Sequence, residues 1–155
     1  MALLDLIADA KHDLLLVSFA AYKVPILVEA IARARERGVT VRFILDSSTE
    51  GGLGVDAKLA FAALEGLTSF YTWRLAKRPL HPSGQPAALH VKCAVADRSR
   101  AIVGSANLTG AALNVNMELG LEVRNGPLPQ QLTSHFNALI ANGDLSPADR
   151  AVDGA

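Results

Sequence analysis

Side chains that could handle a phosphate are concentrated in one stretch of the chain, between Leu89 and Asn107. A histidine can act as nucleophile or acid, a lysine supplies a point charge, and serine and asparagine supply neutral hydrogen-bond donors. This combination predicts a site that cleaves a phosphodiester. The residues of the pattern are His90, Lys92, Asp97, Gly104, Ser105 and Asn107.

Alternation of side chains predicts how this stretch folds. Residues 89–96 alternate, which is typical of a strand whose successive side chains point to opposite faces. His90 and Lys92 would then lie side by side on one face. A turn at 97–100 and a short strand at 101–103 follow, and this hairpin would return the serine and asparagine of the pattern to the histidine. The residues expected to face the core are Leu89, Val91, Cys93 and Val95.

The spacing His-x-Lys-x4-Asp-x6-Gly-Ser-x-Asn is matched at every position and resembles the signature of the phospholipase D superfamily. The apolar run 14–19, the helix after it and the junction 37–41 also resemble the opening strand–helix–strand unit of that family. Glu118 lies where family members carry an acidic partner for the histidine. The resemblance extends over roughly residues 3–140.

The resemblance implies a covalent reaction in which a histidine attacks phosphorus and a second histidine protonates the leaving oxygen. Carried over to this chain, it assigns both histidine roles to His90. Lys92 and Asn107 would hold the non-bridging oxygens, and Ser105 would donate a further hydrogen bond to the substrate. Glu118 would fix the imidazole tautomer.

The reaction needs two such motifs, and the sequence contains one. We therefore expect a homodimer in which the His90 side chains of two copies face each other in one composite site. One histidine must be protonated and the other neutral, which predicts a bell-shaped pH profile. Asp97 and Gly104 are expected to order the hairpin. No metal and no cofactor are expected, because no cluster of His, Cys or carboxylate residues in the sequence resembles a metal site.

The pattern of the other segments predicts one α/β domain over 1–141 and a flexible tail over 142–155. Its fold would be a phospholipase D-like sandwich, with a mixed, mostly parallel sheet flanked by helices on both faces. Helices are expected over 2–11, 24–37, 55–65 and 128–141, and strands over 14–19, 39–45, 68–73 and 116–123. Along the last strand, the residues expected to face the core are Met117, Leu119, Leu121 and Val123.

The composition limits the kinds of partner and the cellular compartment that are expected for the chain. The formal net charge at pH 7 is zero, so a grip on a polyanion must come from a local patch. The single cysteine, Cys93, excludes an internal disulfide framework and is expected to be a packed core thiol. No leader and no apolar run of about 20 residues is found, so a cytoplasmic protein without a membrane partner is expected.

Two loops are candidates for substrate contact. Loop 74–88 carries Arg74, Lys77 and Arg78 and leads directly into His90. It could contact substrate phosphates, or it could be a solvated connector. Loop 46–54 follows a strand and is expected to border the substrate groove.

Three functions remain open at this point. The small size, single motif and basic loop favour an endonuclease that cleaves DNA. A phospholipase or phosphatidyl transferase is the second possibility. The third is a nucleic-acid-binding subunit of a larger restriction or antiviral defence complex.

Overall fold

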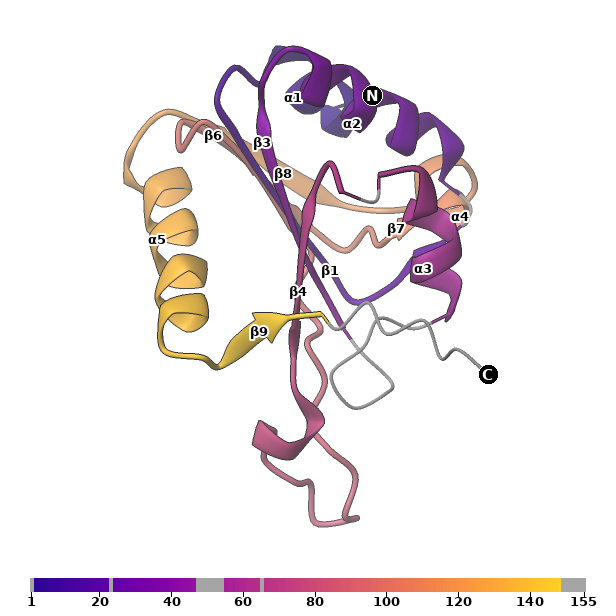
Figure 1. Cartoon of the computed structure of the whole chain (residues 1–155), viewed down its shortest axis with the longest axis vertical. Helices are drawn as coiled ribbons and strands as arrows, with labels where there is room; N and C mark the ends of the chain where they lie inside the picture. Colours follow the sequence, from indigo (N-terminus) through magenta and orange to yellow (C-terminus); the bar gives the residue numbers. More distant parts are fainter. Residues whose placement is uncertain (1, 23, 47–54, 65, 149–155) are drawn as a thin grey trace.

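The first half of the chain alternates strands with helices, as its apolar runs and amphipathic segments predict. The computed structural model describes residues 2–22, 24–46, 55–64 and 66–148 (Figure 1). The helices are α1 Ala2–Asp9, α2 Pro25–Glu36, α3 Val55–Phe61, α4 Gly110–Asn114 and α5 Pro127–Ala141, with 3-10 turns η1 Ala62–Leu64 and η2 Leu75–Lys77. The strands are β1 Asp13–Ser18, β2 Ala21–Tyr22, β3 Thr40–Leu45, β4 Ser69–Trp73, β5 Cys93–Ala96, β6 Arg100–Gly104, β7 Leu108–Thr109, β8 Gly120–Arg124 and β9 Leu145–Pro147.

The main sheet has the strand order β8-β6-β5-β1-β3-β4-β9, and β2 pairs with β7 in a small second sheet. Strands β1, β3 and β4 are parallel because a helix follows each of the first two and carries the chain back. The pairings of β5, β6, β8 and β9 in this sheet are antiparallel. The predicted mixed α/β sandwich is therefore confirmed. The expectation of a mostly parallel sheet is wrong, because four of the six pairings between the described strands of this sheet are antiparallel.

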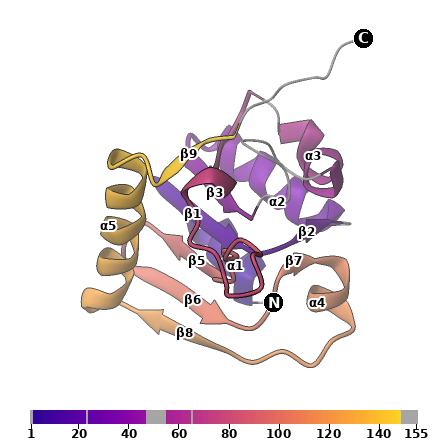
Figure 2. The same cartoon turned by 90° about the horizontal axis from the view of Figure 1, so that it is seen from below.

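Helices cover both faces of the sheet, and each face has its own core (Figures 1 and 2). Strand β1 divides its side chains between them. Leu14 and Leu16 pack in the core under α1, α2 and α3, whereas Leu15 and Val17 pack in the core under α5. All four side chains are at most 2% exposed. A central strand buried on both faces explains why this run is continuously apolar.

The strand that carries the motif is shorter than the sequence predicts. β5 begins at Cys93, which pairs with Val17 of β1 and Val103 of β6. β1 ends one residue after Val17, so the segment before Cys93 runs beyond the end of its neighbour. Val91 is 41% exposed rather than in the core. Cys93 is buried as expected, and burial raises the pKa of its thiol to about 12.

The last predicted strand differs most from expectation. β8 spans Gly120–Arg124, pairs with β6 and forms one edge of the sheet. Three of the four residues expected in the core are instead exposed, at 102% for Met117, 81% for Leu119 and 71% for Leu121, whereas Val123 is half-buried. Alternation shows which side chains share a face, but not whether another element covers that face.

The predicted flexible tail from 142 is also wrong in part. β9 pairs antiparallel with β4, and Leu145 is 3% exposed in the core under α5. The domain thus includes residues up to at least Ala148, whose N–H donates to Phe70 O at 2.9 Å. Residues 149–155 lie outside the described residues.

Candidate active site

Three segments meet at the same end of strands β1, β5 and β6, and two of them carry the motif residues of the site. β5 and β6 form an antiparallel hairpin, so the residues before β5 and those after β6 lie at the same end. The carboxyl end of β1 reaches this end as well, because Val17 pairs with Cys93. His90 and Lys92 come from the first segment, Ser105 and Asn107 from the second, and Phe19 from the third.

The His90 imidazole lies between a cation and an aromatic ring. Lys92 Nζ is 3.1 Å from His90 Nδ1 and donates to the His90 carbonyl oxygen at 2.9 Å. The Phe19 ring centroid is 4.9 Å from the imidazole centroid, and Lys92 Nζ is 5.6 Å from the same phenyl ring. An ammonium group has only donors, so this contact needs an unprotonated Nδ1. In this arrangement a neutral imidazole carries its proton on Nε2.

Lys92 has an environment suited to a phosphate ligand. Partial burial lowers the pKa of its ammonium group, and the charge of Glu118 opposes that shift. A partly desolvated cation binds an incoming anion more strongly than a fully hydrated one does.

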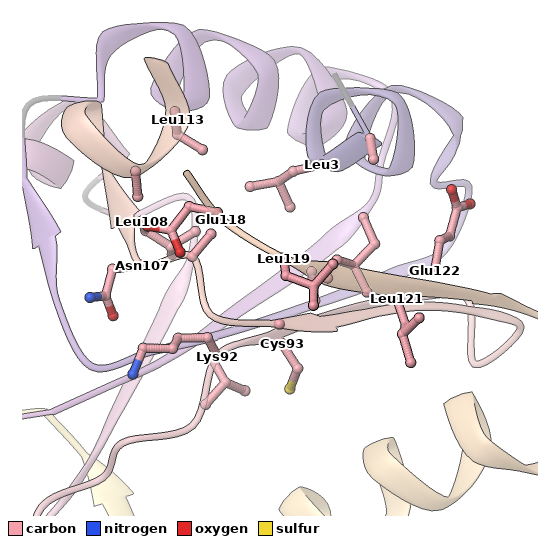
Figure 3. Close-up of a pocket in the computed structure, with 18 residues that line it drawn as sticks. Leu3, Lys92, Cys93, Asn107, Leu108, Leu113, Glu118, Leu119, Leu121 and Glu122 are labelled. Carbon is pink, nitrogen blue, oxygen red and sulfur yellow. The ribbon is translucent and has the colours of Figure 1, made fainter. Parts of the chain in front are cut away.

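Asn107 has a polar group available for a ligand. Its Oδ1 atom is buried and has no hydrogen-bond partner. The backbone beside it is fixed, because the Leu108 N–H donates to Ser18 Oγ at 3.0 Å and to Ala20 O at 3.1 Å. Figure 3 shows the Asn107 amide and the Lys92 amine ending on the same side of a cavity. The Lys92 ammonium and the Asn107 Nδ2 could therefore donate to the oxygens of one phosphate, whereas Oδ1 can only accept.

Ser105 and Glu118 bind each other and do not reach His90 in the described contacts. The Ser105 hydroxyl donates to Glu118 Oε2 at 2.5 Å and accepts from the Leu119 N–H at 3.1 Å. Strand β6 separates the chain around Glu118 from β5. The expectation that Glu118 directly orients the imidazole of its own chain is thus not met. Its carboxylate acts on Ser105 and, through its charge, on Lys92.

Gly104 and Asp97 have clear places in the hairpin. A Cβ atom on Gly104 would lie 2.6 Å from Leu119 O, so only glycine allows the β8 segment to come this close. Asp97 lies in the β5–β6 turn, and its carboxylate accepts hydrogen bonds from the N–H groups of Lys11, His12 and Asp13. It is therefore at the opposite end of the hairpin from His90.

The basic loop contributes less free charge than the sequence suggests. Arg78 is 7% exposed and forms an ion pair with Asp46 at 2.8 Å, so the predicted phosphate contact of Arg78 is wrong. Lys77 is exposed, and its Nζ donates to Gly143 O. Arg74 is partly exposed, and its Nε is buried without a partner. Lys77 and Arg74 remain candidates for substrate contact.

An open cavity of about 360 Å³ adjoins the site. Lys92, Asn107 and Glu118 line one part of it, and apolar side chains such as Leu3, Leu113 and Leu119 line most of the rest, together with Glu122 (Figure 3). The site is thus next to a surface that could receive apolar groups.

Sequence reasoning missed Phe19, and it placed Asp46 in a loop bordering the groove without giving this residue a role of its own. Both follow the carboxyl end of a parallel strand, which is where ligand-binding residues gather in α/β sheets. That position was the available signal. Apart from Asp46, the loop expected to border the groove lies outside the described residues.

Two searches of the described residues gave no candidates. No group of three or more His, Cys, Asp or Glu side chains there is arranged to hold a metal. None of the helices in the described parts of the chain is long and apolar enough to span a bilayer.

Comparison with known proteins agrees with this geometry. Residues 3–140 match the family described as "Cardiolipin synthase, PLD-like domain". Cardiolipin synthase B of Salmonella typhi is 28% identical over 154 residues, which cover 96% of this chain and 34% of the relative. The chain thus spans about a third of the length of the curated relatives it matches.

Two solved structures share the fold. NucT from Helicobacter pylori superposes with a TM-score of 0.78 at 17% identity, covering 94% of this chain and 88% of the other. Nuc from Salmonella typhimurium, described as a phospholipase D family member, superposes with a TM-score of 0.71 at 23% identity and the same coverage. With the family match over most of its length, the chain belongs to the phospholipase D superfamily.

Proposed function

We propose that the chain is a metal-independent phosphodiesterase that cleaves DNA through a phosphohistidine intermediate. The observation that supports this proposal best is that His90, Lys92 and Asn107 lie together at one end of strands β5 and β6. Lys92 is a partly desolvated cation, and the Asn107 amide can donate from Nδ2 to a phosphate oxygen. These groups can hold a phosphate while an imidazole attacks it.

In the first step, Nε2 of His90 attacks phosphorus, a P–N bond forms and the bond to the leaving oxygen breaks. A second, protonated histidine gives that oxygen its proton. In the second step, water attacks phosphorus, the P–N bond breaks and the second histidine accepts a proton from the water. Lys92 and Asn107 stabilise the charge on the non-bridging oxygens in both steps.

The contact between Lys92 and His90 Nδ1 belongs to the resting chain under this mechanism. The nucleophile needs a proton on Nδ1 so that Nε2 is free, and the acid needs protons on both nitrogens. Neither role is compatible with a hydrogen bond from Lys92 to Nδ1. Phosphate oxygens would draw the ammonium away, so substrate binding itself releases Nδ1 for the reactive tautomer.

The second histidine would come from a second copy of the chain. The chain has four histidines but one copy of the motif. The surface that a second copy would cover is the apolar strip, which we define as Val115, Met117, Leu119 and Leu121. Their exposed fractions range from 71% to 102%, and they precede or lie on edge strand β8. Ser105 bonds to Leu119 within this segment, so the strip is continuous with the site.

A lipid substrate is the second candidate. The apolar lining of the cavity beside Lys92 and Asn107 favours it, because a phospholipid carries acyl chains next to its phosphodiester. The match to proteins named cardiolipin synthase also supports it. Hydrolysis or transfer of a phosphatidyl group would use the same two histidine steps.

The test is cleavage of labelled single-stranded and double-stranded DNA in excess EDTA. The wild type is expected to cut, and His90→Ala to lose about 10³-fold or more of the rate, because it lacks the nucleophile. His135→Ala is the matched control, since this exposed histidine lies on α5 and should leave the rate unchanged. Equal cutting by His90→Ala would overturn the mechanism.

The same proteins are then tested on vesicles that contain phosphatidylglycerol. DNA cutting without lipid turnover supports the nuclease, and His90-dependent lipid turnover without DNA cutting supports the second candidate. If the wild type shows neither DNA cleavage nor lipid turnover, both proposed enzyme functions are wrong for the isolated chain.

A further inference from the structure

The chain between β4 and His90 folds back on itself and projects from the sheet (Figure 1). The Ala87 N–H donates to Pro79 O at 2.9 Å, and the His81 N–H donates to Gln85 O at 2.8 Å. Most of residues 79–88 are exposed. The segment that leads into the candidate nucleophile is thus a solvated projection, and the position of His90 depends on how its base is held.

Arg78 closes the base of this projection. Its side chain is 3% exposed, and its guanidinium donates to Trp73 O and Ala87 O, on either side of the loop. It also lies 5.4 Å from the Trp73 ring centroid. The planar guanidinium presents donors in several directions, so one side chain can hold both ends together.

Asp46 joins that base to the sheet. It follows β3, and its N–H donates to Ser18 O at 3.2 Å, next to Phe19. Its Oδ1 lies 2.8 Å from Arg78 Nη1 and accepts from the Leu89 N–H at 3.1 Å. The carboxylate is 12% exposed. One oxygen therefore connects the buried arginine to the residue immediately before His90.

We propose that Asp46 and Arg78 are positioning residues that fix the His90 imidazole for attack, which rests on the proposed function. The pair holds the backbone of Leu89 against the end of β3, while the end of β1 places Phe19 against the His90 ring. A displacement of about 1 Å at a reacting group can slow a reaction by about 10²-fold. A loosened base would misplace the nucleophile without removing any group that binds phosphate.

The first test uses Asp46→Asn, which keeps the shape and an oxygen acceptor for the Leu89 N–H but removes the charge facing Arg78. With bis(p-nitrophenyl) phosphate as substrate, kcat is expected to fall by about 10- to 100-fold while KM changes by less than about threefold. A split of this kind separates misplacement of the nucleophile from loss of substrate binding.

The matched control is Asp13→Asn. Asp13 and Arg42 form a partly buried ion pair, at 2.9 Å, between β1 and β3, at the opposite end of β3 from Asp46. Asp13→Asn is expected to lower the melting temperature as much as Asp46→Asn does, with kcat unchanged. Equal losses of kcat in both variants, or an unchanged kcat in Asp46→Asn, would overturn the proposal.

A second variant tests the proposal if Asp46→Asn does not fold. The double variant Asp46→Asn, Arg78→Gln removes both charges, so neither is left buried without its partner. It is expected to have the reduced kcat of Asp46→Asn, and a wild-type kcat in the folded double variant would contradict the proposal.

Failure of the proposed function can be recognised separately. If the wild type turns over no phosphodiester, the pair is tested by NMR on 13C-labelled imidazoles, with the His90 signal assigned by its loss in His90→Ala. A shifted or broadened His90 signal in Asp46→Asn, but not in Asp13→Asn, is the expected result. An unchanged His90 signal would overturn the positioning role.

Discussion

At the scale of single residues, His90 has neighbours of two kinds. The Lys92 ammonium lies 3.1 Å from Nδ1, whereas Phe19 places an aromatic ring 4.9 Å from the imidazole centroid. Rings at this separation attract each other by about 0.5–1.5 kcal/mol beyond their buried area. Phe19 therefore limits rotation of the imidazole when Lys92 turns to the substrate.

Phe19→Leu tests this role of the phenyl ring. Loss of the ring contact is expected to lower kcat by roughly two- to tenfold, which corresponds to the energy of an aromatic pair. KM should change little, because Lys92 and Asn107 remain. Steady-state kinetics on the substrate that the wild type cleaves measure both constants. Phe19→Tyr keeps the ring and should retain kcat, so an equal fall in both variants would exclude this explanation.

The motif residues were predictable because they lie close together in the chain at fixed spacing. Phe19 and Asp46 come from the ends of other strands, and only the fold brings them to His90. Arg78 was misjudged for a related reason: a guanidinium in a basic loop has the same sequence signal whether it faces solvent or a buried carboxylate. Glu118 was expected on His90, but its nearest described partners are Ser105 and Asn116.

At the scale of elements, the β5–β6 hairpin is fixed by its turn. Asp97 and Arg98 have φ values of 52° and 55°, the left-handed conformation that a tight hairpin turn of this hand requires. The Asp97 carboxylate accepts hydrogen bonds from three N–H groups at the start of β1. Desolvation raises the pKa of this carboxyl, but these bonds outweigh it and the net pKa is lowered.

Asp97→Ala is expected to destabilise the fold by about 1–3 kcal/mol, because it leaves N–H donors unpaired. The sign of the pH dependence follows from the lowered pKa. The wild-type advantage is present above the unfolded aspartate pKa and is lost as pH falls through the lower folded value. Urea unfolding of both proteins over a series of pH values measures this.

Asp97→Asn is the control, since asparagine tolerates the positive φ and loses only the charge. It should lie between the wild type and Asp97→Ala in stability at neutral pH. A gap between wild type and Asp97→Ala that stays constant down to acid pH would contradict the role of the ionised carboxylate.

Most elements were predictable from hydrophobic pattern, because β1, β3 and α2 carry apolar residues at the period of their own structure. The errors are at elements whose state depends on a neighbour. β5 could not be bounded without knowing where β1 ends. The exposed side of β8 could not be foreseen, since its alternation is the same as that of a covered strand.

At the scale of the whole molecule, the low net charge and the exposed apolar surface both favour a dimer. The formal net charge is zero and Arg78 is buried, so a single copy offers little attraction to a polyanion. The apolar strip leads into edge strand β8, whose unpaired backbone groups are open to a second chain. Pairing two copies along β8 would cover the apolar strip. It would also bring loop 74–88 of each copy beside one shared site.

A composite site predicts that an inactive chain poisons an active one. After joint unfolding and refolding with an excess of His90→Ala, the activity at fixed wild-type concentration should fall in proportion to the wild-type fraction of all chains, because mixed dimers lack one histidine. Independent monomers would instead keep the full activity of the wild-type chains present. The measurement is the rate on DNA at fixed wild-type concentration.

The apolar strip provides the control that locates the interface. The chain His90→Ala, Leu119→Asp should not poison the wild type, because a buried carboxylate without a partner would prevent pairing. The chain His90→Ala, Leu59→Asp should poison it fully, since Leu59 is similarly exposed, at 74%, but lies on α3, away from β8. Sedimentation velocity should accordingly show a monomer for Leu119→Asp and a dimer for Leu59→Asp. If both double variants inhibit the wild type, the interface lies elsewhere on the chain. If His90→Ala and both double variants all leave the wild-type activity unchanged, each chain works alone.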